Sequence, residues 1–252
     1  MYTTTVVRNA PRGKVHGGLY KDSELVLSWN DADFDFEGRG GDRGLRGLVT
    51  YENRLYVAAA DRILILENHK IIDTIRHPCL RLLHEMCRTE TGFWVVSTGY
   101  DAVLHYDFEK GFTEGLHFGD QVVSTLSPPK GNRWHLNSVS TFRNKLLISG
   151  LRTHNFPTGT HSTRMDEHGF IFCDTDRNCL NVYGTEYAAH FTPQCGYGAR
   201  SGFLRGLARN NDVLYVGTSP AAVQEFNLTT REWGQKTVLS NDFRVAVQSI
   251  IV

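Results

Sequence analysis

The sequence predicts an all-β fold made of repeated units of short strands. The segment Leu45–Leu48 is followed, nine residues after Arg46, by an apolar run that begins at Leu55. The same arrangement returns far along the chain, where Leu214 follows Arg205 by nine residues. Two near-copies of one strand–turn–strand unit are typical of a repeat architecture. No stretch of the chain shows a persuasive helical period of apolar residues, so an α/β fold is not expected.

The nine-residue offset recurs at three further places. In each, a polar residue opens a strand and a second apolar run begins nine residues later. These pairs are His84 with Phe93, Asn137 with Leu146, and His161 with Phe170. The unit that begins near His135 looks truncated, because the strand signal after Leu151 is weak.

Within each complete unit, four short strands are expected in order, separated by turn residues. The predicted strands lie at 46–51, 55–59, 63–66 and 71–75; at 84 onward, 93–97, 102–106 and 114–118; at 161 onward, 170–174, 179–183 and 187–191; and at 205 onward, 214–218, 223–227 and 233–238. Strands are also expected at 15–20 and 24–29, before the first unit, and at 244–252, after the last.

The two ends of the chain complement each other. The last segment resembles a first strand with nothing after it, and the N-terminal strands lack a first strand. Pairing them creates a sixth unit and closes a ring, which removes exposed sheet edges. Six units in 252 residues means about 42 residues each, a usual size for a propeller blade. The prediction is a single domain over residues 1–252, a six-bladed β-propeller; a five-bladed ring is the alternative, because the third unit is weak.

Composition narrows the classes of partner. The formal net charge is zero, so we expect neither nucleic acid nor an anionic membrane as partner. No apolar run reaches the length of a membrane-spanning helix. The first residues do not have the pattern of a signal peptide, and the five cysteines show no Cys-x-x-Cys spacing. We therefore expect a cytoplasmic protein with reduced thiols and a small molecule as its partner.

One residue of each unit falls at the start of the innermost strand, where it is expected at one mouth of the central channel. We call these six residues the mouth ring: Arg46, His84, Asn137, His161, Arg205 and Gln248. A purely structural ring would show small or apolar residues at this place. The register was found from the apolar runs and not from the polar residues, which favours a functional site.

The order around the mouth ring predicts two halves with different chemistry. His84, Asn137 and His161 lie on adjacent units, and two imidazoles with an amide oxygen are suitable ligands for a divalent metal ion. On the other side we expect a carboxylate, phosphate or sulfate of the substrate to be held by Arg46, Arg205 and Gln248. Each histidine taken alone is more often a structural residue than a ligand.

Three further residues are candidates for catalysis. Glu85 follows His84 directly, and His135 precedes Asn137 by two residues, so either would complete or support the metal site. Asp174 ends the second strand of its unit and is the best-placed acid for general-base catalysis. The structural alternative is that the two arginines of the mouth ring pair with Glu85 or Asp174 and join blades together.

Several short phrases carry a resemblance to known proteins. Segments 45–48, 97–101, 135–139 and 217–220 resemble a family of bacterial propeller proteins without an assigned activity, over nearly the whole chain. More distantly, the architecture resembles the gluconolactonase and paraoxonase six-bladed propellers. These hold a divalent metal at the channel mouth through Glu, Asn and Asp, which implies that Glu85, Asn137 and Asp174 correspond by place. The Pro-Asn pair typical there is Leu136-Asn137 in this chain, and this departure, with the His and Arg content, argues against lactone hydrolysis.

Three functions follow from these observations. The first is a metal-dependent enzyme, of hydrolase, lyase or isomerase type, that acts on a small anionic or polyhydroxylated substrate at the channel mouth. The alternative is a non-catalytic propeller that recognises an anionic ligand or a protein through the same Arg and His residues. A scaffold that binds through its outer loops is the third, since fold does not decide among them.

Overall fold

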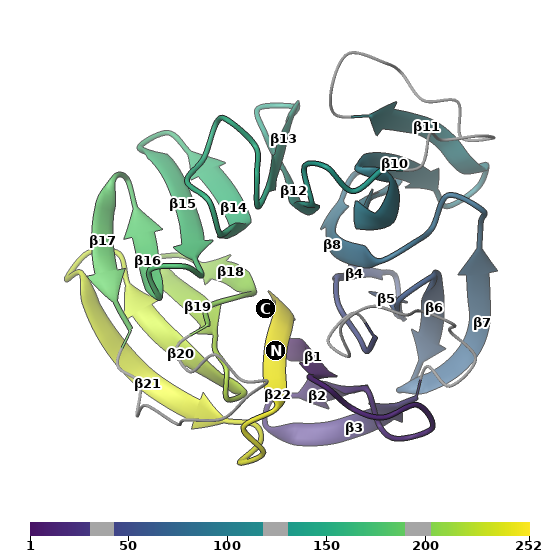
Figure 1. Cartoon of the computed structure of the whole chain (residues 1–252), viewed down its shortest axis with the longest axis horizontal. Helices are drawn as coiled ribbons and strands as arrows, with labels where there is room; N and C mark the ends of the chain where they lie inside the picture. Colours follow the sequence, from purple (N-terminus) through teal and green to yellow (C-terminus); the bar gives the residue numbers. More distant parts are fainter. Residues whose placement is uncertain (31–42, 118–130, 190–202) are drawn as a thin grey trace.

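The computed structural model describes residues 1–30, 43–117, 131–189 and 203–252, and these form antiparallel sheets arranged around a central axis (Figure 1). Five sheets have four strands and one has two. In each sheet the strand nearest the axis is the first of its unit, so β22, β4, β8, β12, β14 and β18 line the centre. This arrangement is a β-propeller, which confirms the predicted fold class.

The four-stranded sheets run outward from the axis, each beginning with its inner strand. They are β22 (Val245–Ile251), β1 (Tyr2–Val7), β2 (Gly17–Lys21) and β3 (Glu24–Trp29); β4 (Leu48–Tyr51), β5 (Arg54–Ala58), β6 (Arg62–Glu67) and β7 (Lys70–Arg76); β8 (Leu83–Arg88), β9 (Gly92–Ser97), β10 (Ala102–Asp107) and β11 (Gly111–His117); β14 (Thr160–Asp166), β15 (Gly169–Asp174), β16 (Cys179–Val182) and β17 (Thr185–Ala188); and β18 (Leu207–Asn210), β19 (Val213–Gly217), β20 (Ala222–Asn227) and β21 (Glu232–Val238). The two-stranded sheet consists of β12 (Leu136–Phe142) and β13 (Lys145–Gly150).

The third unit departs from the pattern of the others. Within the described residues it contributes only the hairpin of β12 and β13, so the number of complete blades is five, as in the five-bladed alternative, and six complete blades do not form. After β13 the chain turns, because the Thr153 hydroxyl donates to the carbonyl of Gly150 and Thr160 N donates to the carbonyl of Pro157. The turning segment leads directly into β14, so no third strand of that sheet is formed there.

The ring closes between the two ends of the chain, as predicted. Strand β22 pairs antiparallel with β1, with Tyr2 opposite Ile251 and Val7 opposite Val245. The blade so formed combines a C-terminal inner strand with three N-terminal strands. No other described sheet is built from both ends of the sequence, so this pairing replaces two exposed edges with one continuous sheet.

Buried apolar side chains fill the spaces between neighbouring sheets. One cluster joins the β4–β7 blade to the β8–β11 blade through residues such as Tyr56 and Phe93. Further clusters join β2 to β4–β6, β15 and β16 to β18–β20, β20 to β22, and β9 and β10 to β12. Between β12–β13 and β14 the described contacts are polar instead, and Ser149 Oγ lies 2.7 Å from Thr163 Oγ1.

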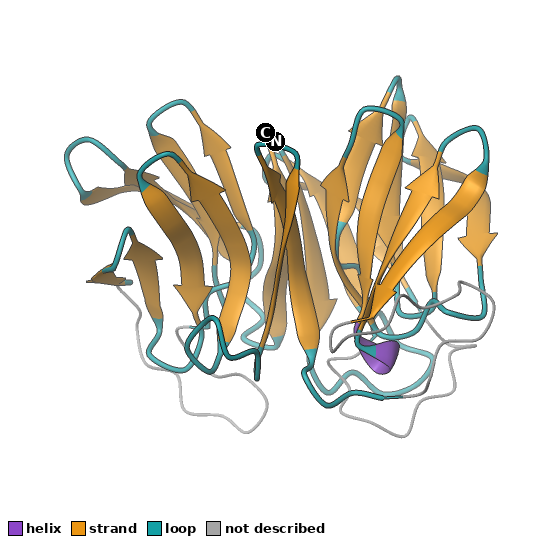
Figure 2. Cartoon of the chain, turned by 90° about the horizontal axis from the view of Figure 1, so that it is seen from above, coloured by secondary structure: helices purple, strands orange, loops and turns teal. Residues whose placement is uncertain are grey.

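The two rims of the propeller differ. In side view, the N- and C-termini lie together on one rim, and the short 3-10 helix η2 (Thr98–Tyr100) lies on the opposite rim (Figure 2). In the described part of the chain no helix is long and apolar enough to cross a membrane. Cys79, Cys87, Cys173 and Cys179 are free thiols, and burial raises the pKa of Cys173, so this thiol stays protonated.

Close backbone contact between two blades predicts a sensitive position at Gly47. A Cβ atom there would lie 2.5 Å from both the carbonyl oxygen of His84 and the amide nitrogen of Met86. We expect Gly47→Ala to lower the free energy of unfolding by about 1–3 kcal/mol, as for overpacked cores. Urea unfolding measures this, with Gly131→Ala as control, because a Cβ at Gly131 meets nothing within 4 Å. Equal stability of the two variants would contradict the prediction.

Candidate functional site

Gln248 is the point at which two arginines from different blades meet. Its Oε1 accepts hydrogen bonds of 3.0 Å from a terminal nitrogen of Arg46 and of 3.0 Å from one of Arg205. Its Nε2 donates to the carbonyl of Val247 at 2.9 Å, which directs Oε1 toward the arginines. Since each nitrogen is 3.0 Å from the same oxygen, the two lie at most 6.0 Å apart.

His84 continues this chain of contacts on the next blade. Its Nε2 lies 3.1 Å from the same Arg46 nitrogen, and its Nδ1 lies 3.0 Å from the carbonyl of Leu82 and 2.6 Å from Thr98 Oγ1. A guanidinium only donates and a carbonyl only accepts. The proton of neutral His84 is therefore on Nδ1, and Nε2 accepts from Arg46. Thr98 belongs to η2, so the mouth ring lies on the rim opposite the termini (Figure 2).

His161 repeats the same local arrangement in another blade. Its Nδ1 lies 2.8 Å from the carbonyl of Gly159 and 3.4 Å from Thr175 Oγ1. Both Thr98 and Thr175 follow their histidine by fourteen residues, a spacing that identifies them as equivalent. The proton of His161 is again on Nδ1, and its buried Nε2 has no hydrogen-bond partner among the described residues.

Asn137 lies on β12, beside the strand that carries His161. Its Nδ2 donates to the carbonyl of Thr160 at 3.0 Å, which fixes the orientation of the amide. The side chain is 4% exposed, and within the described part of the chain its Oδ1 has no partner. The site therefore presents two buried acceptors, one on Asn137 and one on His161.

Phe203 forms an aromatic wall that the repeat pattern did not predict. The guanidinium carbon of Arg205 lies 4.2 Å from the centre of its ring, and that of Arg8 lies 4.3 Å from it. The ring of His161 lies 5.7 Å from it. Phe203 precedes Arg205 by two residues, but Gly44 precedes Arg46 by two, so the repeat gave no signal for this aromatic. Arg8 comes from outside the repeat pattern altogether.

Both histidines of the mouth ring are neutral near pH 7. Burial, followed by the positive charge of Arg46, holds the pKa of His84 well below its usual value. Burial, followed by the positive charge of Arg205, does the same to the pKa of His161. The half-buried His135 ring lies 5.5 Å from that of His84, and its Nδ1 lies 3.0 Å from Asn132 Oδ1.

The structure therefore brings the predicted mouth ring together. Direct hydrogen bonds join Arg46, His84, Arg205 and Gln248. His161 joins them through Phe203, and Asn137 joins through the start of β14. The roles assigned to these residues in binding and catalysis stay predictions.

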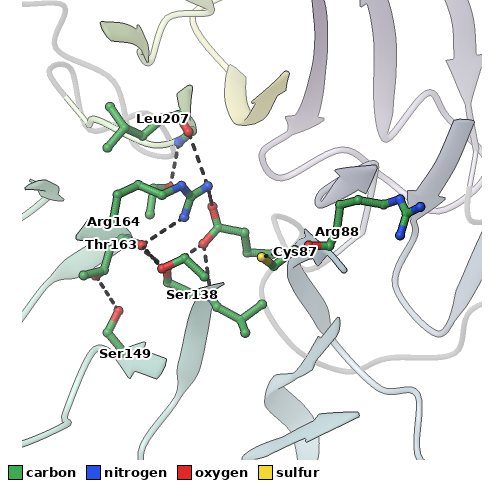
Figure 3. Close-up of polar contacts among 12 residues, drawn as sticks. Cys87, Arg88, Ser138, Ser149, Thr163, Arg164 and Leu207 are labelled. Atoms are coloured by element: carbon green, nitrogen blue, oxygen red, sulfur yellow. Dashed lines mark hydrogen bonds and ion pairs between the residues drawn. The ribbon is translucent and has the colours of Figure 1, made fainter. Parts of the chain in front are cut away.

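Glu85 belongs to a separate network that joins strands β8, β12 and β14, and it is buried itself. Its carboxylate is 2.5 Å from the guanidinium of Arg164 and 2.5 Å from Ser138 Oγ, and Val139 N donates to it at 3.3 Å. Figure 3 shows how Arg164, Thr163 and Ser138 gather beside Ser149 at the polar contact between β12–β13 and β14. The oxygens of Glu85 thus hold strands together, and the arginine that pairs with them is not one of the mouth ring.

Asp174 has a structural set of contacts as well. Its Oδ1 accepts hydrogen bonds from the backbone nitrogens of Asp176 and Arg177, each at 3.0 Å. This pattern stabilises the turn that follows β15. Asp174 is 2% exposed. The predicted general base is therefore a buried residue whose Oδ1 is already occupied by the hydrogen bonds of a turn.

The contacts of the predicted metal ligands bear on whether an ion fits between them. The described residues contain no group of three or more His, Cys, Asp or Glu arranged to hold a metal ion. His84 Nε2 accepts a hydrogen bond from a guanidinium. Of the three predicted metal ligands, only His161 Nε2 and Asn137 Oδ1 therefore have a lone pair that no described residue uses. Two neutral ligand atoms beside the positive charges of Arg46 and Arg205 do not suit a divalent cation, because the arginines repel it. A metal at this site remains a prediction that this geometry does not favour.

A cavity of about 520 Å³ lies elsewhere, and no residue of the mouth ring lines it. It is formed mainly by β1, β2, β3 and the segment that leads into β22. Its lining residues are Thr5, Val7, Ala10, Pro11, Lys14, Val15, Gly17, Gly18, Tyr20, Leu25, Ser28, Ser240, Asp242, Arg244 and Val245.

Comparison with solved structures supports the fold. A chain of the nidogen/laminin complex superposes with a TM-score of 0.60 at 8% identity, over 99% of this chain and 97% of that one. The Neurospora crassa Pan2 WD40 domain (TM-score 0.39, 16% identity, 88% of this chain) and Myxococcus xanthus glutaminyl cyclase (0.40, 12%, 75%) are weaker matches. The chain spans 60% and 67% of those two chains, respectively. No family model and no curated protein matches, so the resemblance to gluconolactonases stays a prediction.

The Glu85–Arg164 pair predicts a measurable coupling. Glu85→Met removes the partner of the Arg164 guanidinium, whose side chain is 32% exposed, and should lower the free energy of unfolding by about 1–3 kcal/mol. The double variant with Arg164→Met should be less destabilised than the sum of the single variants, with a coupling of about 1–3 kcal/mol. Urea unfolding gives the four values of the cycle. Arg177→Met is the control, since its exposed pair with Glu186 should contribute no more than about 1 kcal/mol. Additive single effects would contradict a coupled pair.

The lowered pKa of His161 predicts that folding stability falls in mild acid. Below about pH 6.5 the unfolded chain takes up a proton on this imidazole and the folded chain does not, so the free energy of unfolding decreases by up to ~1.4 kcal/mol per pH unit. Urea unfolding between pH 7.5 and 5.5 should therefore show wild type losing stability relative to His161→Phe. His168→Gln, at an exposed position, is the control. A constant difference between wild type and His161→Phe would refute this explanation.

Proposed function

We propose that the channel mouth binds a small anion, which Arg46 and Arg205 recognise together. The observation that carries this proposal is the convergence of both guanidiniums on Gln248 Oε1. The amide of Gln248 is neutral, and its Oε1 holds one terminal nitrogen of each arginine in place. This arrangement supports the non-catalytic alternative, in which the ring recognises an anion, more than it supports a metal site.

The electrostatics of the site favour a negative ligand. The two terminal nitrogens that share Gln248 Oε1 lie at most 6.0 Å apart, and guanidiniums this close repel each other, the more so because Arg46 is 2% exposed. An anion between them turns this repulsion into attraction. Guanidinium forks also match the planar geometry of carboxylates and the oxygens of phosphate.

The neighbouring groups are consistent with this assignment. His84 and His161 stay neutral, so they add no further positive charge. Phe203 holds the plane of Arg205 and leaves the edge of its guanidinium for hydrogen bonds. Within the mouth ring, Arg205 is half-buried and the other five residues are buried. His135, next to the ring, is also half-buried. The ligand therefore enters past Arg205 and His135.

A metal-dependent enzyme is the second proposal, and one observation favours it. His161 Nε2 and Asn137 Oδ1 are buried acceptors without described partners, and both atoms are of the type that ligate divalent metals. His84 would have to exchange Arg46 for the ion. Of the three predicted catalytic residues, His135 alone lies beside the mouth ring with part of its surface exposed; Glu85 is engaged by Arg164, and Asp174 by the turn after β15.

Substitution of the two arginines tests the anion proposal. Isothermal titration calorimetry with glycolate and with inorganic phosphate should show binding to wild type that weakens at least ~10-fold in Arg46→Gln and in Arg205→Gln, the usual loss when a charged hydrogen-bond donor is removed. Arg209→Gln is the matched control, because Arg209 is exposed and pairs with Asp166. Binding that is unchanged in both variants, or absent in wild type, would overturn the proposal.

Elemental analysis of protein purified without a His tag separates the second proposal from the first. Stoichiometric metal that is lost in the His84→Ala, His161→Ala double variant supports the metal-dependent enzyme. Anion binding by metal-free protein that depends on Arg46 and Arg205 supports the first.

A further inference from the structure

We propose that the anion bound at the channel mouth carries a hydroxyl group beside its acidic group, and that the single hydroxyl proton is shared by His161 Nε2 and Asn137 Oδ1 in a three-centre hydrogen bond. This inference rests on the proposed function and defines its ligand class as hydroxylated organic anions, such as 2-hydroxy acids. In this assignment, His161 and Asn137 recognise the hydroxyl group of the ligand.

The first support is the state of His161. The residue is 3% exposed, and its Nδ1 proton is used by the carbonyl of Gly159. The lone pair of Nε2 is therefore fixed in direction, buried, and without a partner in the described residues. Leaving a buried acceptor unsatisfied is unfavourable, and such groups in native proteins are nearly always paired. A ligand that donates a hydrogen bond satisfies this atom.

The second support is independent of the histidine. Asn137 is 4% exposed, and its Nδ2 is held by the carbonyl of Thr160. The amide cannot be reversed without losing that hydrogen bond, so Oδ1 is the group presented to a ligand. It too lacks a partner among the described residues. Two buried hydrogen-bond acceptors on adjacent inner strands thus have no donor among the described residues.

The acceptors and the arginines belong to one site. His161 and Arg205 both pack against Phe203. The imidazole centre of His161 lies 5.7 Å from the centre of that ring, and the guanidinium carbon of Arg205 lies 4.2 Å from it. The acceptor of His161 is therefore close to the proposed anion-binding arginine. A ligand that satisfies both sides must carry a negative group and a hydrogen-bond donor close to each other. A simple carboxylate would leave the acceptors on Asn137 and His161 unsatisfied.

A hydroxyl is a better donor at this site than an ammonium group. His161 and Arg205 pack against the same Phe203 ring, so the positive charge of Arg205 lies near this imidazole. The same charge repels a ligand ammonium. A hydroxyl donates without adding charge, so hydroxy acids should bind better than amino acids of the same size.

Three isosteric probes test this inference on the wild-type protein. Glycolate, propionate and glycine place a hydroxyl, a methyl or an ammonium group on the same short carboxylate. By calorimetry, glycolate should bind at least ~10-fold more tightly than propionate or glycine, because a site built for a hydroxyl rejects analogues that lack it. Equal affinities for glycolate and propionate would overturn the inference.

Two variants connect that preference to the named atoms. His161→Phe and Asn137→Leu keep the approximate shape of each side chain and remove the acceptor, and each should reduce the glycolate preference to less than ~3-fold while propionate binding persists. Circular dichroism verifies folding, and the wild-type comparison stands if either variant does not fold. Arginine-dependent binding that does not distinguish glycolate from propionate would refute this inference alone; no binding of any probe would refute the proposed function as well.

Discussion

The pairing of β22 with β1 is the contact on which the rest of the structure depends. It joins Val245–Ile251 to Tyr2–Val7 and makes one sheet from the two ends of the sequence. In an open arc, β1 and β22 would each be left with an unpaired edge. The apolar clusters on both sides of β22 are completed only in the closed ring. Closure also brings Gln248 between the arginines of two other blades.

A shared register explains why separate strands produce one site. Each inner strand begins on the same rim, so the polar residues at those starts converge although they are far apart in sequence. His84 and His161 show how closely the repeat is followed, because each uses Nδ1 for the carbonyl two residues earlier and a threonine fourteen residues later. The same geometry holds both imidazoles in the same tautomer. What differs is the partner of Nε2, which is Arg46 for one and, among described residues, absent for the other.

Regular spacing allowed much of this to be predicted from the sequence. The apolar runs and their constant offset predicted the propeller, its closure by the terminal strands and the residues that meet at the mouth. Contacts between blades left no such signal. Arg164 pairs with Glu85 across a separation of 79 residues, and Arg8 packs on Phe203 from outside the repeat. The register placed Asp174 at the end of a second strand, but it could not show that the carboxylate accepts hydrogen bonds from the following turn instead of facing a ligand. The truncated unit was visible as a weak pattern, but its length was decided by the turn at Thr153.

The place of Gln248 has a consequence for how the protein is made. This residue lies in β22, so a growing chain holds Arg46 and Arg205 before it holds the amide that connects them. During synthesis the amide of Gln248 is added only after both blades that carry the arginines. The assembled mouth is therefore a mark of a completed ring, because β22, the strand that closes the ring against β1, also carries the amide that joins the two arginines.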